Sequence, residues 1–203
     1  MSTEQQKSIA VFCASASGAS PVYREAACEL GRRIAERSYG LVYGGASVGT
    51  MGALADAALA AGGKVVGVIP GVIIDLEIAH PGLTELHIVG TMHERKALMA
   101  ERADAFIALP GGYGTLDEFI EIVTWAQLRI HAKPSVMVNV GGYYDPLLRF
   151  FDHAVEAGMI KQENRSLVQV ARDASEALEI VERDWSRRAA VPQLDAKMNE
   201  LVK

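Results

Sequence analysis

The segment Ala105-Phe-Ile-Ala-Leu109-Pro-Gly-Gly-Tyr-Gly-Thr-Leu-Asp-Glu118 joins three kinds of sequence. It opens with five apolar residues, passes through a turn of proline and glycine, and continues into helical periodicity that extends to Ile130. An unbroken apolar run is typical of a strand buried on both faces, as in a parallel sheet covered by helices. The segment therefore predicts one strand–loop–helix unit of an α/β protein.

The same pattern repeats along the chain on both sides of this unit. Further strands are expected over residues 8–13, 40–43, 64–69, 85–89 and 135–139, with another near 167–170. Helices are expected between them, over residues 21–37, 48–61, 92–102, 115–130, 146–157 and 174–183. The alternation predicts a three-layer α/β sandwich, a parallel sheet with helices on both faces. Residues 1–184 are expected to form a single domain and residues 185–203 a polar C-terminal tail.

Composition excludes several other classes. The 203 residues are 50% hydrophobic and carry a net charge of −5, unlike a disordered chain or a typical duplex-binding protein. The longest charge-free stretch, residues 38–55, is interrupted by glycines and is no membrane span. Cys13 and Cys28 are too few for a disulfide framework and lack the spacing of a metal site. The polar N-terminus has no secretory pattern, so we expect a cytoplasmic protein.

Glycine-rich loops follow most of the expected strands. In a parallel sheet, ligands bind beyond the carboxyl ends of the strands, near the point where strand order reverses. Loops at residues 13–18, 44–45, 70–71, 110–114 and 141–142 would all lie on that edge. We therefore expect a glycine-lined cleft for a ligand that carries phosphate.

Common nucleotide and hydrolase motifs are absent. The chain has no G-x-x-x-x-G-K-[ST] loop and no G-x-S-x-G elbow. Gly45-x-x-x-Gly49-x-x-Gly52 lacks the start of a dinucleotide fingerprint, and Ala97 replaces the second histidine of a zinc motif that would begin at His93.

The loop from Pro110 to Thr115 has two interpretations. Glycines let backbone N–H groups approach an anion, and a helix N-terminus favours negative charge, so the loop would cradle a phosphate. Alternatively it is only a tight turn, with Thr115 and Glu118 as a capping box. Spacing alone leaves both open.

A second helix start, Thr91-Met-His-Glu-Arg95-Lys96, precedes this loop by one strand. Thr91 and Glu94 fit a capping box, so Glu94 is expected to be structural. Arg95 and Lys96 are either solvated charges or groups that hold a phosphate or assist a departing base. On the next helix, Glu118 and Glu121 share one side, which suits chemistry at a sugar carbon or is merely an acidic surface.

Together, Met92-His-Glu-Arg-Lys96 and Pro110-Gly-Gly-Tyr-Gly-Thr-Leu-Asp-Glu118 resemble the Lonely Guy family of cytokinin riboside 5′-monophosphate phosphoribohydrolases, often labelled lysine decarboxylases. The similarity extends from residue 11 to about residue 160. It implies a Rossmann-like, nucleotide-binding homodimer that cleaves the N-glycosidic bond of (N6-modified) adenosine 5′-monophosphate, giving free base and ribose 5-phosphate, without a metal or other cofactor. Nucleic acid and membranes are not expected partners.

The resemblance also implies the site residues. Arg95 and Glu118 match the catalytic positions. The expected substrate-binding residues are Ser15, Gly45, Glu77, Lys96, Gly111, Gly112, Tyr113, Gly114, Thr115, Leu116, Asp117, Glu121 and Thr124. Two segments depart from the family pattern. The first loop is Cys13-Ala-Ser-Ala16, where the family usually has Cys-Gly-Ser-Ser. Residues 70–77, which would approach the base, also differ from the family sequence.

An alternative function is a non-catalytic carrier for a phosphate-bearing group such as molybdenum cofactor, which would need the cradle but not Arg95 with Glu118. Lysine decarboxylation is not expected, because no lysine has the context of a pyridoxal site. Trp125 and Leu128 fall off the expected core stripe of their helix, formed by residues 119, 122, 123 and 126, and therefore predict a homodimer interface on that helix.

Overall fold

Seven parallel strands form one sheet in this computed structural model, which describes residues 6–73 and 78–190. The strands are β1 (Ser8–Phe12), β2 (Gly40–Tyr43), β3 (Val65–Pro70), β4 (Glu85–Val89), β5 (Ala105–Ala108), β6 (Ser135–Val138) and β7 (Gln169–Ala171). Their order across the sheet is β4-β3-β2-β1-β5-β6-β7. The chain thus builds outward from β1 to β4 and then returns to place β5 on the other side of β1.

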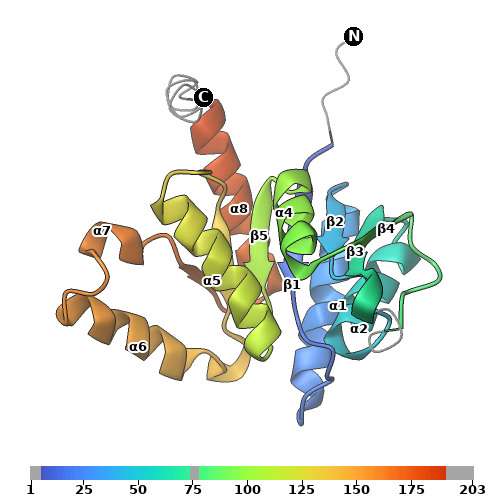
Figure 1. The fold of residues 1–203 in the computed structure, drawn as a ribbon, viewed down its shortest axis with the longest axis horizontal. Coiled ribbons are helices and arrows are strands. Elements are labelled where there is room, and N and C mark those ends of the chain that lie inside the picture. The colour runs from blue at the N-terminus through green and yellow to red at the C-terminus, as the bar shows by residue number, and fades with distance from the viewer. Residues whose placement is uncertain (1–5, 74–77, 191–203) are drawn as a thin grey trace.

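Helices cover both faces of the sheet (Figure 1). One face packs against α1 (Pro21–Glu36), α2 (Gly49–Ala60) and α8 (Ala174–Ala189), and the other against α4 (Met92–Arg102), α5 (Tyr113–Gln127) and α6 (Asp145–Glu156). Short helices η1 (Gly71–Ile73), η2 (Val140–Gly142) and α7 (Gln162–Arg165) lie in the connections. The expected Rossmann-like α/β sandwich is confirmed.

The central strand shows why its sequence is an unbroken apolar run. Ile9 and Val11 point into the core under α1, α2 and α8, while Ala10 and Phe12 point into the core under α4, α5 and α6. Successive side chains of a strand point to opposite faces, so a strand covered on both sides must be apolar at every position.

The C-terminal helix is longer than the sequence indicated. We expected it to end near residue 183, but α8 continues to Ala189. Trp185 explains the extension, because its ring packs against the core and its Nε1 donates to the carbonyl of Asp104 at 3.1 Å. The expected tail from residue 185 therefore starts with helix, and residues 191–203 lie outside the described part. No helix among the described residues is long and apolar enough to cross a membrane.

Candidate active site at the switch point of the sheet

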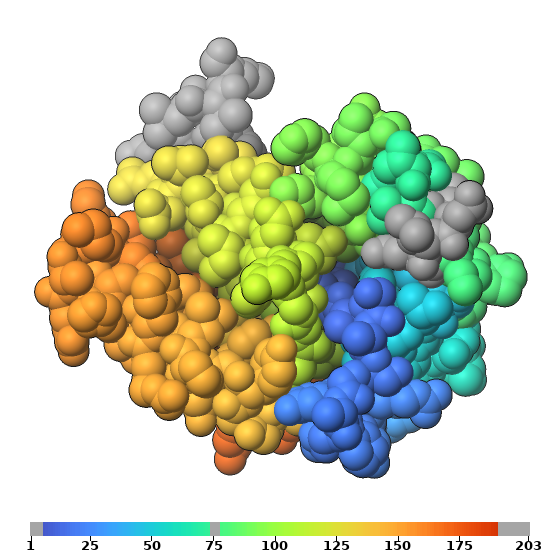
Figure 2. Space-filling view, turned by 60° about the horizontal axis from the view of Figure 1, so that its bottom comes forward, coloured from blue at the N-terminus to red at the C-terminus, as the bar shows by residue number. Residues whose placement is uncertain are grey.

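A cavity of about 250 Å³ opens at the carboxyl ends of β1 and β5, where the strand order reverses. Figure 2 shows this hollow between the blue loop after β1 and the yellow-green start of α5. The described residues that line it are Cys13, Ala14, Ser15, Ala16, Met51, Arg95, Gly112, Tyr113, Gly114, Thr115 and Glu118. Segments from four parts of the chain thus meet at the edge where ligands of such sheets bind.

The glycine loop presents the start of α5 to this cavity. Helix α5 begins at Tyr113, and its N-cap, Gly112, provides no side-chain hydrogen bond to the first turn. A Cβ at Gly112 or Gly114 would meet no atom within 4 Å, so open space lies beside both residues. The first backbone N–H groups of a helix have no partner within it and carry the positive end of its dipole. The geometry therefore favours the anion cradle over the plain turn.

Thr115 is not the N-cap of the helix, as the capping-box interpretation would require. The helix starts two residues before Thr115, so Thr115 lies inside the first turn and is buried against Gly111. Glu118 lies one turn further and lines the cavity. At the start of α4, Thr91 is the N-cap as expected and accepts from the Glu94 backbone N–H at 3.1 Å. The Glu94 carboxylate accepts from the N–H of Gly90 at 2.7 Å, one residue before the N-cap N–H that a capping box would use.

Arg95 is fixed against the ends of two strands. Its Nε donates to the Val68 carbonyl at 3.1 Å, and its Nη2 donates to the Gly44 carbonyl at 3.0 Å. Gly44 makes this approach possible, because a Cβ there would lie 2.0 Å from Nη2. The guanidinium is therefore held in one orientation by the backbone of β3 and of the loop after β2.

The remaining terminal nitrogen of Arg95 faces Glu118. Arg95 Nη1 lies 4.0 Å from Glu118 Oε1, and the two side chains are only 5% and 10% exposed. Water screens a buried ion pair poorly, so the two charges interact strongly at the cavity wall. The cavity thus holds a fixed cation and a carboxylate, close to a helix N-terminus.

Cys13 is also at the cavity but is no nucleophile. Burial, and then the charge of Glu118, raise the pKa of its thiol to about 12. The thiolate is the reactive form of cysteine, so Cys13 is unreactive near neutral pH.

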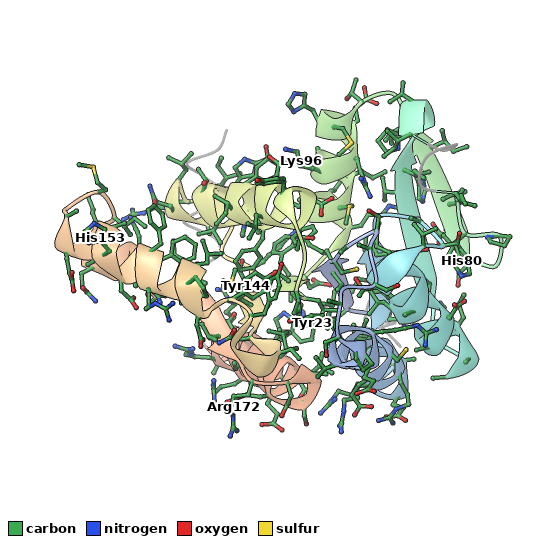
Figure 3. The ribbon with its side chains drawn as sticks, turned by 90° about the horizontal axis from the view of Figure 1, so that it is seen from below. Tyr23, His80, Lys96, Tyr144, His153 and Arg172 are labelled. Atoms are coloured by element: carbon green, nitrogen blue, oxygen red, sulfur yellow. The ribbon has the colours of Figure 1, made fainter. Side chains whose placement is uncertain are left out.

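Lys96 makes a separate ion-pair cluster that ties α4 to α5. Its Nζ lies 3.0 Å from Asp117 Oδ2 and 3.1 Å from Glu121 Oε2. Burial opposes the charge of Lys96, but its hydrogen bond to Asp117 and its ion pair with Glu121 outweigh that effect and raise the lysine pKa. Figure 3 shows Lys96 across helix α5 from Tyr144. Glu121 therefore forms an ion pair with Lys96 and does not line the cavity beside Glu118.

The structure brings together about half of the expected site residues. Seven of them line the cavity: Ser15, Arg95, Gly112, Tyr113, Gly114, Thr115 and Glu118. Gly111 lies directly beneath, against Thr115. Thr124 is exposed, with its hydroxyl bonded to the Ile120 carbonyl, and Gly45 is a buried turn residue with φ of +82°. Thr124 and Gly45 do not line the cavity. The same is true of four other expected residues: Leu116, Lys96, Asp117 and Glu121. Glu77 lies outside the described part of the chain.

Sequence reasoning missed the residues that support the site. Thr50, at the start of α2, exchanges hydrogen bonds with the backbone of Ala14 at 2.9 and 3.0 Å and so holds the loop after β1. Tyr143 and Tyr144 donate to carbonyls of the glycine loop. A supporting tyrosine has no local sequence signal, since its partner lies more than 30 residues away.

The fold and the cavity together define a Rossmann-like α/β protein with its site at the switch point of the sheet. The chain belongs to the Lonely Guy family, as its two motifs predicted. The family model described as "Possible lysine decarboxylase" matches residues 51–181. The cytokinin riboside 5′-monophosphate phosphoribohydrolase of Rhodococcoides fascians is 53% identical over 173 residues, which cover 85% of this chain and 87% of that protein. An enzyme of the same name from Arabidopsis thaliana is 50% identical over 87% of this chain and 81% of its own length.

Solved structures with this fold include a protein of another function. The molybdenum cofactor carrier protein of Chlamydomonas reinhardtii is 26% identical, with a TM-score of 0.67, over 90% of this chain and 99% of that chain. The fold is thus shared by proteins named as hydrolases and as carriers, and the side chains of the cavity must distinguish them.

Proposed function

We propose that this protein hydrolyses the N-glycosidic bond of nucleoside 5′-monophosphates, releasing the free base and ribose 5-phosphate. The observation that carries the proposal is the buried pair of Arg95 and Glu118 in a cavity that also receives the N-terminus of α5. Relatives about 50% identical over most of the chain are named for this activity on cytokinin nucleotides.

The start of α5 would bind the 5′-phosphate. Backbone N–H groups of residues 113–115 and the hydroxyl of Thr115 are donors, and the helix dipole adds attraction for the anion. Glu118 is four residues beyond Gly114, about 6 Å along the helix axis. Binding the phosphate at the helix end would therefore place the ribose beside the carboxylate.

Glu118 would act on the anomeric carbon. As the bond from C1′ to the base nitrogen breaks, the bonding electrons leave with the base and positive charge develops on the sugar. A buried carboxylate stabilises that charge and accepts a proton from the water that attacks C1′. The water oxygen bonds to C1′, the base nitrogen gains a proton from solvent, and Glu118 returns to solvent the proton it took from the attacking water, so the overall reaction consumes one water.

Arg95 would orient the reacting groups. Arginine remains protonated in proteins and donates hydrogen bonds in a fixed plane. Because two backbone carbonyls hold its Nε and Nη2, the guanidinium presents Nη1 to Glu118 and the cavity without reorganisation. It would keep the Glu118 carboxylate aligned towards the sugar.

The likeness to lysine decarboxylases is in name only. A lysine that forms a Schiff base must lose its proton, which requires a lowered pKa. Lys96 is the lysine nearest to the catalytic pair in sequence, and its pKa is raised by its carboxylate partners. Its position in an ion-pair cluster supports a structural role.

We further propose a cytoplasmic homodimer that contacts through the C-terminal end of α5. Leu128 and Ile130 are 62% and 54% exposed there. Large apolar side chains grouped at a helix end favour contact with a partner. Trp125 contributes less than expected, because it packs partly on the core of its own chain. A two-fold contact at this end would bring the partner near Thr124 and Glu121.

The test is incubation with AMP, N6-isopentenyl-AMP and adenosine, followed by chromatography of the free base. We expect base and ribose 5-phosphate from one or both nucleotides and little base from adenosine, because the phosphate supplies binding energy that orients the sugar. Nucleotide binding without base release would instead support a carrier. Equal kcat/KM for AMP and adenosine would contradict the phosphate cradle.

A further inference from the structure

Two consecutive tyrosines hold the glycine loop from outside the cavity. The Tyr143 hydroxyl donates to the Gly111 carbonyl at 2.8 Å, and the Tyr144 hydroxyl donates to the Leu109 carbonyl at 2.6 Å. Both residues follow β6, the strand next to β5, and neither lines the cavity. The loop after one strand is thus fixed by the loop after its neighbour.

The segment that carries these tyrosines is a tight turn closed by side-chain hydrogen bonds. Gly141 and Gly142 both have positive φ, 59° and 75°, which other residues adopt only with strain. Asn139 closes the turn: its Oδ1 accepts from the Tyr144 N–H at 2.7 Å, and its Nδ2 donates to Asp145 Oδ1 at 2.7 Å. The backbone path that leads into the two tyrosines is therefore fixed by these contacts.

Ring contacts fix the two hydroxyl groups further. The rings of Tyr143 and Tyr144 pack edge to face, with their centroids 4.9 Å apart. The Tyr23 ring of α1 packs edge to face on the Tyr143 ring, with a centroid distance of 5.4 Å. Figure 3 labels Tyr23 and Tyr144 near the centre of the view, close to one another. Tyr144 is 2% exposed, whereas Tyr143 is 40% exposed.

The hydrogen bond at Gly111 determines where a backbone donor of the loop points. A trans peptide is planar, so its N–H points away from its C=O. The Gly111 carbonyl points at Tyr143, and the N–H of Gly112 therefore points away from that tyrosine. If this peptide rotated, a carbonyl oxygen would take the place of the donor and would repel an anion.

We propose that Tyr143 and Tyr144 are positioning residues of the anion cradle. Tyr143 keeps the Gly111–Gly112 peptide turned so that its N–H is available to a phosphate. Tyr144 anchors the start of the loop at the Leu109 carbonyl, whose peptide with Pro110 has no N–H of its own. The ligand class rests on the proposed function. The tyrosines touch no substrate and act through Gly111 and Leu109.

Calorimetry with ribose 5-phosphate and with adenosine tests the proposal without requiring turnover. Tyr143→Phe removes one hydroxyl and keeps the ring, so its melting temperature should match wild type because water replaces the exposed group. Its Kd for ribose 5-phosphate should rise about 5- to 10-fold, the scale of one lost hydrogen bond, while its Kd for adenosine stays unchanged. Tyr144→Phe should show the same selectivity and also a lower melting temperature, because it leaves a buried carbonyl without a donor.

Tyr23→Phe is the matched control, since its contact with Tyr143 is between rings and survives the change. It should bind both ligands as wild type does. Unchanged ribose 5-phosphate binding by Tyr143→Phe would overturn the proposal, as would an equal loss for ribose 5-phosphate and adenosine. Calorimetry measures binding directly, without turnover. A wild-type protein that binds ribose 5-phosphate but releases no base would therefore contradict the proposed hydrolase activity and leave the role of the tyrosines intact.

Discussion

Gly44 is the residue at which a small change should disable Arg95 while sparing the fold. A Cβ at position 44 would lie 2.0 Å from Arg95 Nη2 and 2.9 Å from the Met51 sulfur. Real Cβ contacts below 3.0 Å essentially do not occur, so Gly44→Ala must displace the guanidinium by about 1 Å. The φ of Gly44 is not positive, and alanine is therefore compatible with the backbone.

The size of the effect follows from what Arg95 loses. Displacement breaks the charged hydrogen bond from Nη2 to the Gly44 carbonyl, worth about 1.5–3 kcal/mol. It also moves Nη1 relative to Glu118, and a misplacement of about 1 Å can cost about 100-fold in rate. We expect kcat/KM for AMP to fall about 100-fold, which corresponds to about 2.7 kcal/mol. The melting temperature should fall by no more than about 10 °C, so the variant remains folded at 25 °C.

Gly82→Ala is the control for adding one methyl group at a glycine. Its nearest neighbour would be His80 Cε1 at 3.4 Å, an ordinary contact, and it lies away from the cavity. Steady-state kinetics of base release and thermal unfolding, measured on both variants, test whether the loss of activity is specific to position 44. A Gly44→Ala enzyme within threefold of wild type would refute the argument that Gly44 exists to admit Arg95.

Three further outcomes follow from other parts of the structure. The Lys96 ion pairs stabilise the fold fully below the ordinary lysine pKa, and this stabilisation is lost as pH rises through the raised value. Lys96→Met should therefore show a smaller drop in melting temperature than wild type as the pH rises above about 10.4; an equal drop would contradict this. Light scattering should give twice the chain mass of 21.8 kDa for wild type and for the control Met159→Glu, but a smaller mass for Leu128→Glu; a monomeric wild type would exclude the dimer. Iodoacetamide at neutral pH should label the half-buried Cys28 and spare Cys13, whose thiol pKa is about 12, and peptide mass spectrometry would show the reverse if Cys13 were activated.

The fold could be predicted from the sequence because a strand that is buried on both faces of the sheet is an unbroken apolar run. Runs such as Leu41-Val-Tyr43 and Val136-Met-Val138 are apolar at every position, and β2 and β4 have the expected bounds. The end of α8 was not accessible, because the contact that extends it joins Trp185 to Asp104, 81 residues away.

The site was accessible only in part, for a similar reason. The motifs indicated Arg95 and Glu118 but not their geometry: local spacing left Glu118 either a helix cap or a site residue, and the structure places it at the cavity wall. Glu118 and Glu121 share a helix side in projection, yet each meets a different cation, Arg95 and Lys96. Helical periodicity describes one helix, and these roles are set by the helix packed beside it.

In the proposed reaction Glu118 performs chemistry at the sugar rather than supporting the helix. Glu118→Gln keeps the shape of the side chain and removes its charge, and single-turnover and steady-state assays with AMP or N6-isopentenyl-AMP measure the consequence. We predict a kcat at least about 100-fold below wild type, with KM little changed and with ribose 5-phosphate still bound. A Glu118→Gln enzyme that releases base at a near wild-type rate would contradict it.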